Sequence, residues 1–203
     1  MTVKEAIEAR RAIRKYKDTP IPESDIMELM EAARLAPSGT NHQPWRFYVI
    51  RDYETKKAIQ DVSFDQEYIS QAPVLLVCCA DLTAYAHAGT RARLQELIDC
   101  GASAADSLET YPALKMEDSL ENMKGYQSHA MLNVALAIEN LCLRAVELGL
   151  GTCIIQLTRS KKVAAILNLP ETTVITALVP VGYPDEAPKP RPRIPVEDIC
   201  FFK

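Results

Sequence analysis

The stretch from Ala36 to Trp45 reads Ala-Pro-Ser-Gly-Thr-Asn-His-Gln-Pro-Trp and separates two segments of different periodicity. Upstream, apolar residues recur at helical spacing from Pro22 to Leu35, and Pro37-Ser38-Gly39 ends that pattern. Downstream, Trp45 to Ile50 alternates with aromatic and β-branched residues and predicts a strand. The loop is dense in hydroxyl, amide and backbone donors, which can hydrogen-bond a flat heteroaromatic ring. The alternative interpretation is an ordinary Asn/Ser/Gly turn.

The same two periodicities predict the remaining elements. Further helices are expected over Val3–Arg11, Glu54–Val62, Ala130–Gly149 and Ser160–Leu167, and further strands over Pro73–Ala80, Gly151–Leu157 and Val174–Val181. The helix that begins at Ala130 is apolar over a wide face, so it belongs in the core or at a subunit interface. Strands mixed with helices indicate an α/β or α+β sheet protein.

Other parts of the chain have weaker patterns. Arg91 to Cys100 is compatible with a helix, whereas Asp106 to Gly125 has no apolar stripe and is typical of a mobile cover. The tail from Pro188 onward is proline-rich and is expected to be extended. We find no repeat, linker or low-complexity tract, so we predict a single domain over residues 1–203.

Composition excludes several classes of protein. The chain has 203 residues, 48% of them hydrophobic, and its 23 Lys plus Arg against 27 Asp plus Glu give a net charge of −4. This charge argues against general nucleic-acid binding. The apolar run from Ala72 to Ala80 is too short to span a bilayer, and Met1 to Arg11 is charged. We therefore expect a cytoplasmic protein without a membrane partner.

The sequence offers no familiar catalytic or metal motif. Its six cysteines form no CxxC pair and have no histidine at ligand spacing, so we expect buried free thiols rather than disulfides or zinc. No GxGxxG, GxxxxGK[ST], HExxH or GxSxG motif occurs. His42 is interpreted as a hydrogen-bonded residue rather than a general base. We assign no metal and no catalytic nucleophile, and expect an organic cofactor to carry the chemistry.

Two basic clusters lie near opposite ends of the chain. The first is Arg10-Arg11-Ala12-Ile13-Arg14, and the second is Lys189-Pro190-Arg191-Pro192-Arg193. Guanidinium groups match phosphate oxygens bidentately, which favours an anion site. The alternatives are a solvated helix end for the first cluster and a solvated proline-rich tail for the second. Sequence alone does not show whether the clusters converge.

Taken in order, these motifs resemble the FMN-dependent nitroreductase family. The resemblance runs from about residue 5 to residue 200 and rests on both basic clusters, the Pro-Ser-x-x-Asn-x-Gln-Pro-Trp loop and the turn Gly149-Leu150-Gly151-Thr152. It implies an α+β fold with a central, mainly antiparallel sheet flanked by helices. It also implies an intertwined homodimer with two FMN sites at the interface, and NADH or NADPH as electron donor.

The resemblance also implies a set of cofactor-binding residues. The FMN phosphate would be held by Arg10, Arg191 and Arg193, with Arg11 and Ala12 alongside, and Arg14 would reach the N1/O2 edge of the ring. The partner subunit would supply Pro37, Ser38, Gly39 and Asn41. Backbone N–H groups of Ile155, Gln156 and Leu157 would lie near flavin N5 and O4.

Three positions depart from the family pattern. Ala12 stands where the family often has Ser, which removes one hydroxyl donor to the phosphate. Asp65-Gln66 stands where many members have Asn-Gln, so only Gln66 is a candidate flavin contact. The residues from Gly151 to Leu157 differ from members with Trp or Glu-Gly after the turn. These changes bear on the substrate class rather than on the cofactor.

We therefore expect an FMN-dependent oxidoreductase that passes electrons from NAD(P)H to a nitroaromatic, quinone or enone by a ping-pong mechanism. The alternatives are a flavin-binding carrier or regulatory module, a dehalogenating or flavin-degrading member of the family, and a structural dimer with a decayed site. Tyr111, Tyr126 and Phe64 are candidates for stacking on the acceptor, with ordinary packing as the alternative for each.

Overall fold

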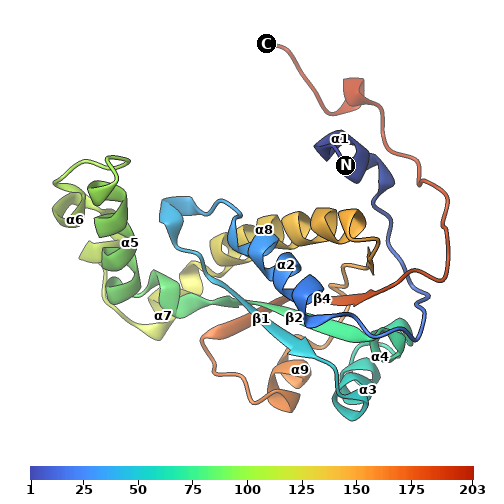
Figure 1. The fold of residues 1–203 in the computed structure, drawn as a ribbon. Coiled ribbons are helices and arrows are strands. Elements are labelled where there is room, and N and C mark those ends of the chain that lie inside the picture. Colours follow the sequence, from blue (N-terminus) through green and yellow to red (C-terminus); the bar gives the residue numbers. More distant parts are fainter.

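The computed structural model describes residues 1–203 and has a four-stranded sheet at its centre (Figure 1). The strands are β1 (Trp45–Ile50), β2 (Val74–Asp81), β3 (Gly151–Thr152) and β4 (Thr173–Gly182). Their spatial order is β1-β2-β4-β3, and every neighbouring pair is antiparallel. The predicted α+β class with an antiparallel sheet is confirmed.

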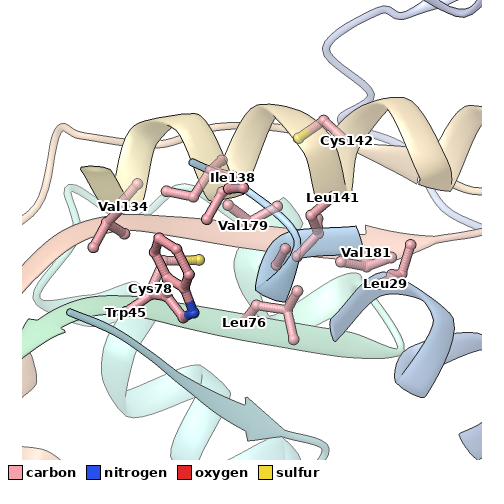
Figure 2. Packing of buried hydrophobic residues seen from close by; sticks show 14 of the residues in the cluster. Leu29, Trp45, Leu76, Cys78, Val134, Ile138, Leu141, Cys142, Val179 and Val181 are labelled. Carbon is pink, nitrogen blue, oxygen red and sulfur yellow. The ribbon is translucent and has the colours of Figure 1, made fainter. Parts of the chain in front are cut away.

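The central strand β2 is buried on both faces, which explains its continuous apolar sequence. Leu76 and Cys78 point into a large core cluster, whereas Leu75, Val77 and Cys79 point into a second, smaller cluster on the opposite face. This alternation follows from the two-residue period of a strand. Figure 2 shows the larger cluster, in which residues of β2 and β4 pack beneath a long helix.

Helices cover both faces of the sheet. The long helix α8 (Gln127–Glu147) lies along one face with α2 (Glu23–Arg34) beside it. The other face carries α3 (Tyr53–Asp61), α4 (Tyr68–Gln71) and α9 (Ser160–Ile166), as Figure 1 shows. No helix combines the length and the apolar character that crossing a membrane would require.

The C-terminus of α8 is set by Gly149, as the sequence predicts. Its φ of +72° is accessible to glycine at little cost. The Leu150 N–H donates to the Ala145 carbonyl at 2.8 Å and the Gly149 N–H donates to the Val146 carbonyl at 3.1 Å, which is the Schellman arrangement. This turn leads the chain directly into β3.

Helix α1 (Val3–Ala9) and the C-terminal tail extend away from the sheet, on the same side of the molecule (Figure 1). Both carry apolar side chains that the fold leaves in solvent. Val3 is 72% exposed, Phe201 is 74% exposed and Phe202 is 97% exposed. Isolated exposed apolar residues are ordinary, but a run of them along two protruding segments is typical of a protein interface.

Several predicted boundaries are wrong. The first helix ends at Ala9 because Arg10 has an extended backbone. The predicted strand Gly151–Leu157 keeps ladder pairing only over its first two residues, and after them Ile155 alone forms a bridge to Leu178. The segment expected to lack a regular pattern contains a series of short helices, α6 (Ser107–Thr110), a 3₁₀ turn (Pro112–Lys115) and α7 (Leu120–Gly125), which follow α5 (His87–Asp99).

The predicted burial of the cysteines is confirmed for four of the six. Cys78, Cys79, Cys142 and Cys153 are buried, and burial raises the pKa of each of these thiols. The prediction is wrong for Cys100, which lies at the end of α5, and for Cys200 in the tail, since both are exposed.

Candidate functional site

The two basic clusters meet in one cleft of about 590 Å³, which we call the cationic cleft. The segment after α1 contributes Arg10, Arg11, Ala12 and Arg14, and the tail contributes Lys189, Arg191 and Arg193. The convergence that sequence could not show is therefore present within one chain. Because the chain as a whole is acidic, this concentration of cations makes a local site for an anion.

Backbone pairing brings the tail to the first cluster. The Lys17 N–H donates to the Tyr183 carbonyl at 2.9 Å, and the Asp185 N–H donates to the Lys15 carbonyl at 2.9 Å. The Glu186 carboxylate then accepts from the backbone N–H groups of Arg14 and Lys15. These contacts place the residues that follow Glu186 opposite the end of α1.

The arginines of the cleft differ in how many hydrogen bonds and ion pairs they already make within the chain. Arg10 pairs with Glu139 of α8 at 3.3 Å, and Arg11 donates to the carbonyls of Glu8 and Arg10, where it caps the end of α1. Arg193 donates to carbonyls of its own tail. The Arg191 carbonyl accepts from Arg193, but the Arg191 guanidinium makes no hydrogen bond or ion pair within the chain, so its donors are available to a ligand.

Arg14 points toward a different set of groups from the other arginines. Its guanidinium lies 5.8 Å from the ring centroid of Tyr68, the first residue of α4. The Tyr68 hydroxyl donates to Gln66 Oε1 at 2.5 Å. Gln66 Nε2 in turn donates to the Ser63 and Leu157 carbonyls at 2.7 and 2.9 Å. Both amide donors of Gln66 are thus used within the chain, and its contact with a flavin stays a prediction.

The backbone N–H groups of Ile155, Gln156 and Leu157 differ in whether they have a hydrogen-bond partner within the chain. The Ile155 N–H donates to the Leu178 carbonyl at 2.9 Å and so is not available to a ligand, in contrast to the prediction. The N–H groups of Gln156 and Leu157 have no acceptor in the chain, and both residues are exposed. Unpaired backbone donors in an ordered segment are suited to a hydrogen-bonding ligand.

The loop that includes Pro37, Ser38, Gly39 and Asn41 lies elsewhere, and none of its residues lines the cationic cleft. Thr40, Asn41 and Gln43 have positive φ angles. The Ser38 hydroxyl accepts from the Gln43 N–H at 3.0 Å, and the Gly39 N–H donates to Asn133 of α8 at 3.3 Å. The loop is therefore a built structure, but in one chain it is not joined to the arginines.

A second cavity of about 410 Å³ adjoins this loop, and we call it the aromatic cavity. The rings of His42 and Tyr85 stack 4.3 Å apart, and those of Tyr85 and Tyr126 stack 5.2 Å apart. The Thr40 and Tyr111 hydroxyls are hydrogen-bonded at 2.9 Å at its wall. Tyr111 and Tyr126 thus lie where an aromatic ligand could reach them.

Phe64, the third predicted stacking residue, lies under Arg159 and lines neither cavity.

His42 is buried and held in one tautomer. Its Nδ1 faces the Gly39 carbonyl at 2.8 Å, which requires an N–H there, so Nε2 is the acceptor for the Thr90 hydroxyl at 3.4 Å. Burial lowers the pKa of His42 below its usual value. These contacts agree with the prediction of a hydrogen-bonded residue.

Sequence reasoning missed several residues of the aromatic cavity, among them Tyr85, Thr90 and Asn133. Asn133 donates to the Tyr85 hydroxyl at 2.9 Å and is buried. The available signal was an asparagine within the apolar face of the predicted helix from Ala130, since a buried polar side chain in such a position has a hydrogen-bond partner.

Comparison with known proteins agrees with this arrangement. Residues 7–183 match the model of the nitroreductase family. A protein of Thermus thermophilus named NADH dehydrogenase is 34% identical, over 100% of this chain and 97% of its own length. An FMN reductase [NAD(P)H] of Bacillus subtilis is 28% identical, over 93% of this chain and 68% of its own. The crystal structure of a nitroreductase family protein from Streptococcus pneumoniae superposes with a TM-score of 0.80 at 26% identity, covering each chain completely.

The chain therefore belongs to the nitroreductase family.

Proposed function

We propose that the protein is an FMN-dependent oxidoreductase that transfers electrons from NADH or NADPH to a small electron-poor acceptor. The observation that carries this proposal is the cationic cleft, where both basic clusters meet. Its Arg14 is linked through Tyr68 and Gln66 to the Leu157 peptide, whose N–H is unpaired. A phosphate at one end and a hydrogen-bonding ring at the other match this donor set. The relatives named FMN reductase and NADH dehydrogenase support the same cofactor and electron donor.

The residues of the cleft divide into a phosphate end and a ring end. Arg10, Arg191 and Arg193 would hold the phosphate, with Arg11 and Ala12 beside them. Arg14 would place its positive charge at the N1/O2 edge of the ring, where it favours added negative charge. The N–H groups of Gln156 and Leu157 would donate toward N5 and O4.

Bound FMN would supply the chemistry by accepting a hydride from NAD(P)H and passing electrons in a second step to a nitroaromatic, quinone or enone. The chain needs no acid or base of its own, because water or the acceptor can provide the proton.

We further propose that a homodimer completes each site. The loop with Ser38, Gly39 and Asn41 lines no part of the cationic cleft of its own chain, which supports the prediction that a second copy supplies this loop to the site. The exposed apolar residues of α1 and the tail, such as Val3 and Phe202, provide surface for such an association. A monomeric protein with bound FMN in small-angle X-ray scattering would contradict this part of the proposal.

An anaerobic absorbance experiment tests the proposed activity. Purified protein reconstituted with FMN is recorded before and after NADH, then NADPH, and then an electron-poor nitroaromatic. We expect one donor or both to bleach the flavin band and the nitroaromatic to restore it. A flavin band that neither donor bleaches would indicate a carrier. The absence of flavin binding after reconstitution would overturn the proposal.

Matched variants test the assigned ends of the cleft. Replacing Arg191 and Arg193 by Gln removes charges from the phosphate end, so we expect the Kd for FMN to rise by about tenfold or more. The Kd for riboflavin, which lacks the phosphate, should stay within about twofold of wild type. Arg159→Gln is the control, because Arg159 lies on Phe64 outside the cleft. Equal losses for FMN and riboflavin would contradict the assignment.

A further inference from the structure

Tyr68 and Gln66 connect two parts of the proposed ring end that come from distant segments of the chain. Arg14 follows α1, whereas Leu157 follows β3, and the structure joins them through the Tyr68 ring, the Tyr68 hydroxyl and the Gln66 carboxamide. We propose that Tyr68 and Gln66 are positioning residues that hold the Arg14 guanidinium and the Leu157 peptide against the same flavin ring and thereby set its redox potential. This inference rests on the FMN binding proposed above.

The first link is the contact between Arg14 and Tyr68. The Arg14 side chain makes no salt bridge, and the carboxylate of Glu186 accepts from the backbone N–H groups of Arg14 and Lys15. The guanidinium instead lies 5.8 Å from the Tyr68 ring centroid, within the range of a cation–π contact. Tyr68 is half-buried, so the ring is a fixed surface for the cation.

The second link is the set of hydrogen bonds made by the Gln66 carboxamide. Its oxygen accepts from the Tyr68 hydroxyl at 2.5 Å, and its nitrogen donates to the Ser63 and Leu157 carbonyls. A primary amide has two N–H donors, and both are used. The direction of the carboxamide is therefore fixed by Tyr68 at one end and by the backbone at the other.

The third link is the orientation of the Leu157 N–H. The Thr158 N–H donates to the Gln156 carbonyl at 2.9 Å, and Gln66 donates to the Leu157 carbonyl in the next peptide unit. The C=O and N–H of a trans peptide point in opposite directions. With the Gln156 carbonyl held toward Thr158, the Leu157 N–H of the same peptide points away from it and stays unpaired. The network thus presents a donor in a defined direction.

Redox potential and affinity measurements on variants test this inference. Tyr68→Leu removes the ring and the hydroxyl and leaves Arg14 without its support. We expect the Kd for reduced FMN to rise about fivefold more than the Kd for oxidised FMN, measured as a shift of the midpoint potential to lower values. Tyr68→Phe keeps the ring and should keep most of the wild-type potential. Gln66→Met removes the link to Leu157 and should raise the Kd for FMN by about threefold to tenfold.

Two controls separate positioning from a merely structural role. Tyr53→Leu alters an exposed tyrosine at the start of α3 and should change neither potential nor affinity. In an Arg14→Ala background, Tyr68→Leu should cause no further shift in potential, because the cation that it positions is gone. Urea unfolding of the apoproteins reports any loss of stability separately.

The possible outcomes are distinct. An unchanged potential in Tyr68→Leu that still binds FMN would overturn the inference, and so would an equal shift in the presence and absence of Arg14. If Tyr68→Leu does not fold, the other two variants still test the inference. Wild-type affinity for FMN in Gln66→Met would overturn it. A midpoint potential in Tyr68→Phe as low as that of Arg14→Ala would also overturn it. Wild-type protein that does not bind FMN would instead overturn the proposed function.

Discussion

Gly151→Ala tests how the first basic cluster is positioned. Ile13, between Arg11 and Arg14, packs directly over Gly151 at the start of β3. A Cβ added at Gly151 would lie 2.7 Å from Ile13 Cγ1 and 2.9 Å from Ile13 Cβ. Ile13 is buried, and its N–H donates to the Thr152 carbonyl at 2.9 Å, so neither segment can move freely. The methyl group must therefore displace the segment that carries the arginines.

The size of the effect follows from the closeness of these contacts. Overpacking of a close-packed interior costs about 1 to 3 kcal/mol. We expect urea unfolding of the apoprotein to show a loss of free energy of unfolding in this range, with an unchanged dependence on urea concentration. FMN titration should show a raised Kd as well, because Arg10 and Arg14 move with Ile13.

Two further variants make the result specific. Gly125→Ala adds its Cβ into open space at the end of α7. Its free energy of unfolding should therefore not fall more than about 0.5 kcal/mol below that of wild type. Ile13→Ala combined with Gly151→Ala removes two of the three close atoms, so the double variant should lose less than the sum of the single losses. Wild-type stability and FMN affinity in Gly151→Ala would refute the reasoning.

Two other predictions concern single polar groups. Glu186→Gln replaces a carboxylate that accepts from the Arg14 and Lys15 N–H groups by a neutral acceptor, and should lower the free energy of unfolding by about 1 kcal/mol in urea, whereas Glu197→Gln in the exposed tail should not. Burial lowers the pKa of His42, so the unfolded chain binds its proton more readily and wild-type stability should fall as pH decreases below about 6.5. The difference in stability between wild type and His42→Gln should shift against wild type over that range, and a pH-independent difference would contradict the assignment.

The sheet and its helices could be predicted because their signals are local. The apolar run of β2 and the wide apolar face of α8 both follow from burial, and the end of α8 follows from Gly149. The strand predicted over Gly151–Leu157 is confirmed only for Gly151 and Thr152, which form β3. It is wrong beyond them because the apolar Cys153 and Ile155 are typical of a strand, although the chain leaves the ladder after Thr152. Apolar pattern reports burial and does not report which backbone groups pair.

The candidate site was predictable in its composition and not in its arrangement. The arginines and the loop could be recognised, but pairing of the tail with the residues around Lys15 depends on backbone contacts between the two ends of the chain. Gln66 shows the limit for a single residue. Its type suggests a ligand contact, whereas its neighbours Ser63, Tyr68 and Leu157 use all of its donors.

The partners of the arginines also favour one direction for the FMN that we propose in the cleft. Arg10 and Arg11 are close to the end of α1 and already have partners, while Arg191 lies on the tail with none, so the greatest unneutralised charge is at the tail side. Arg14 faces Tyr68, which is joined through Gln66 to the Leu157 peptide. A phosphate carries about two negative charges and is drawn to the tail side, whereas a ring with hydrogen-bond acceptors is suited to the side of Arg14. The net charge of −4 does not oppose the proposed binding of an anionic cofactor, since attraction depends on the cations that the fold leaves unpaired in the cleft.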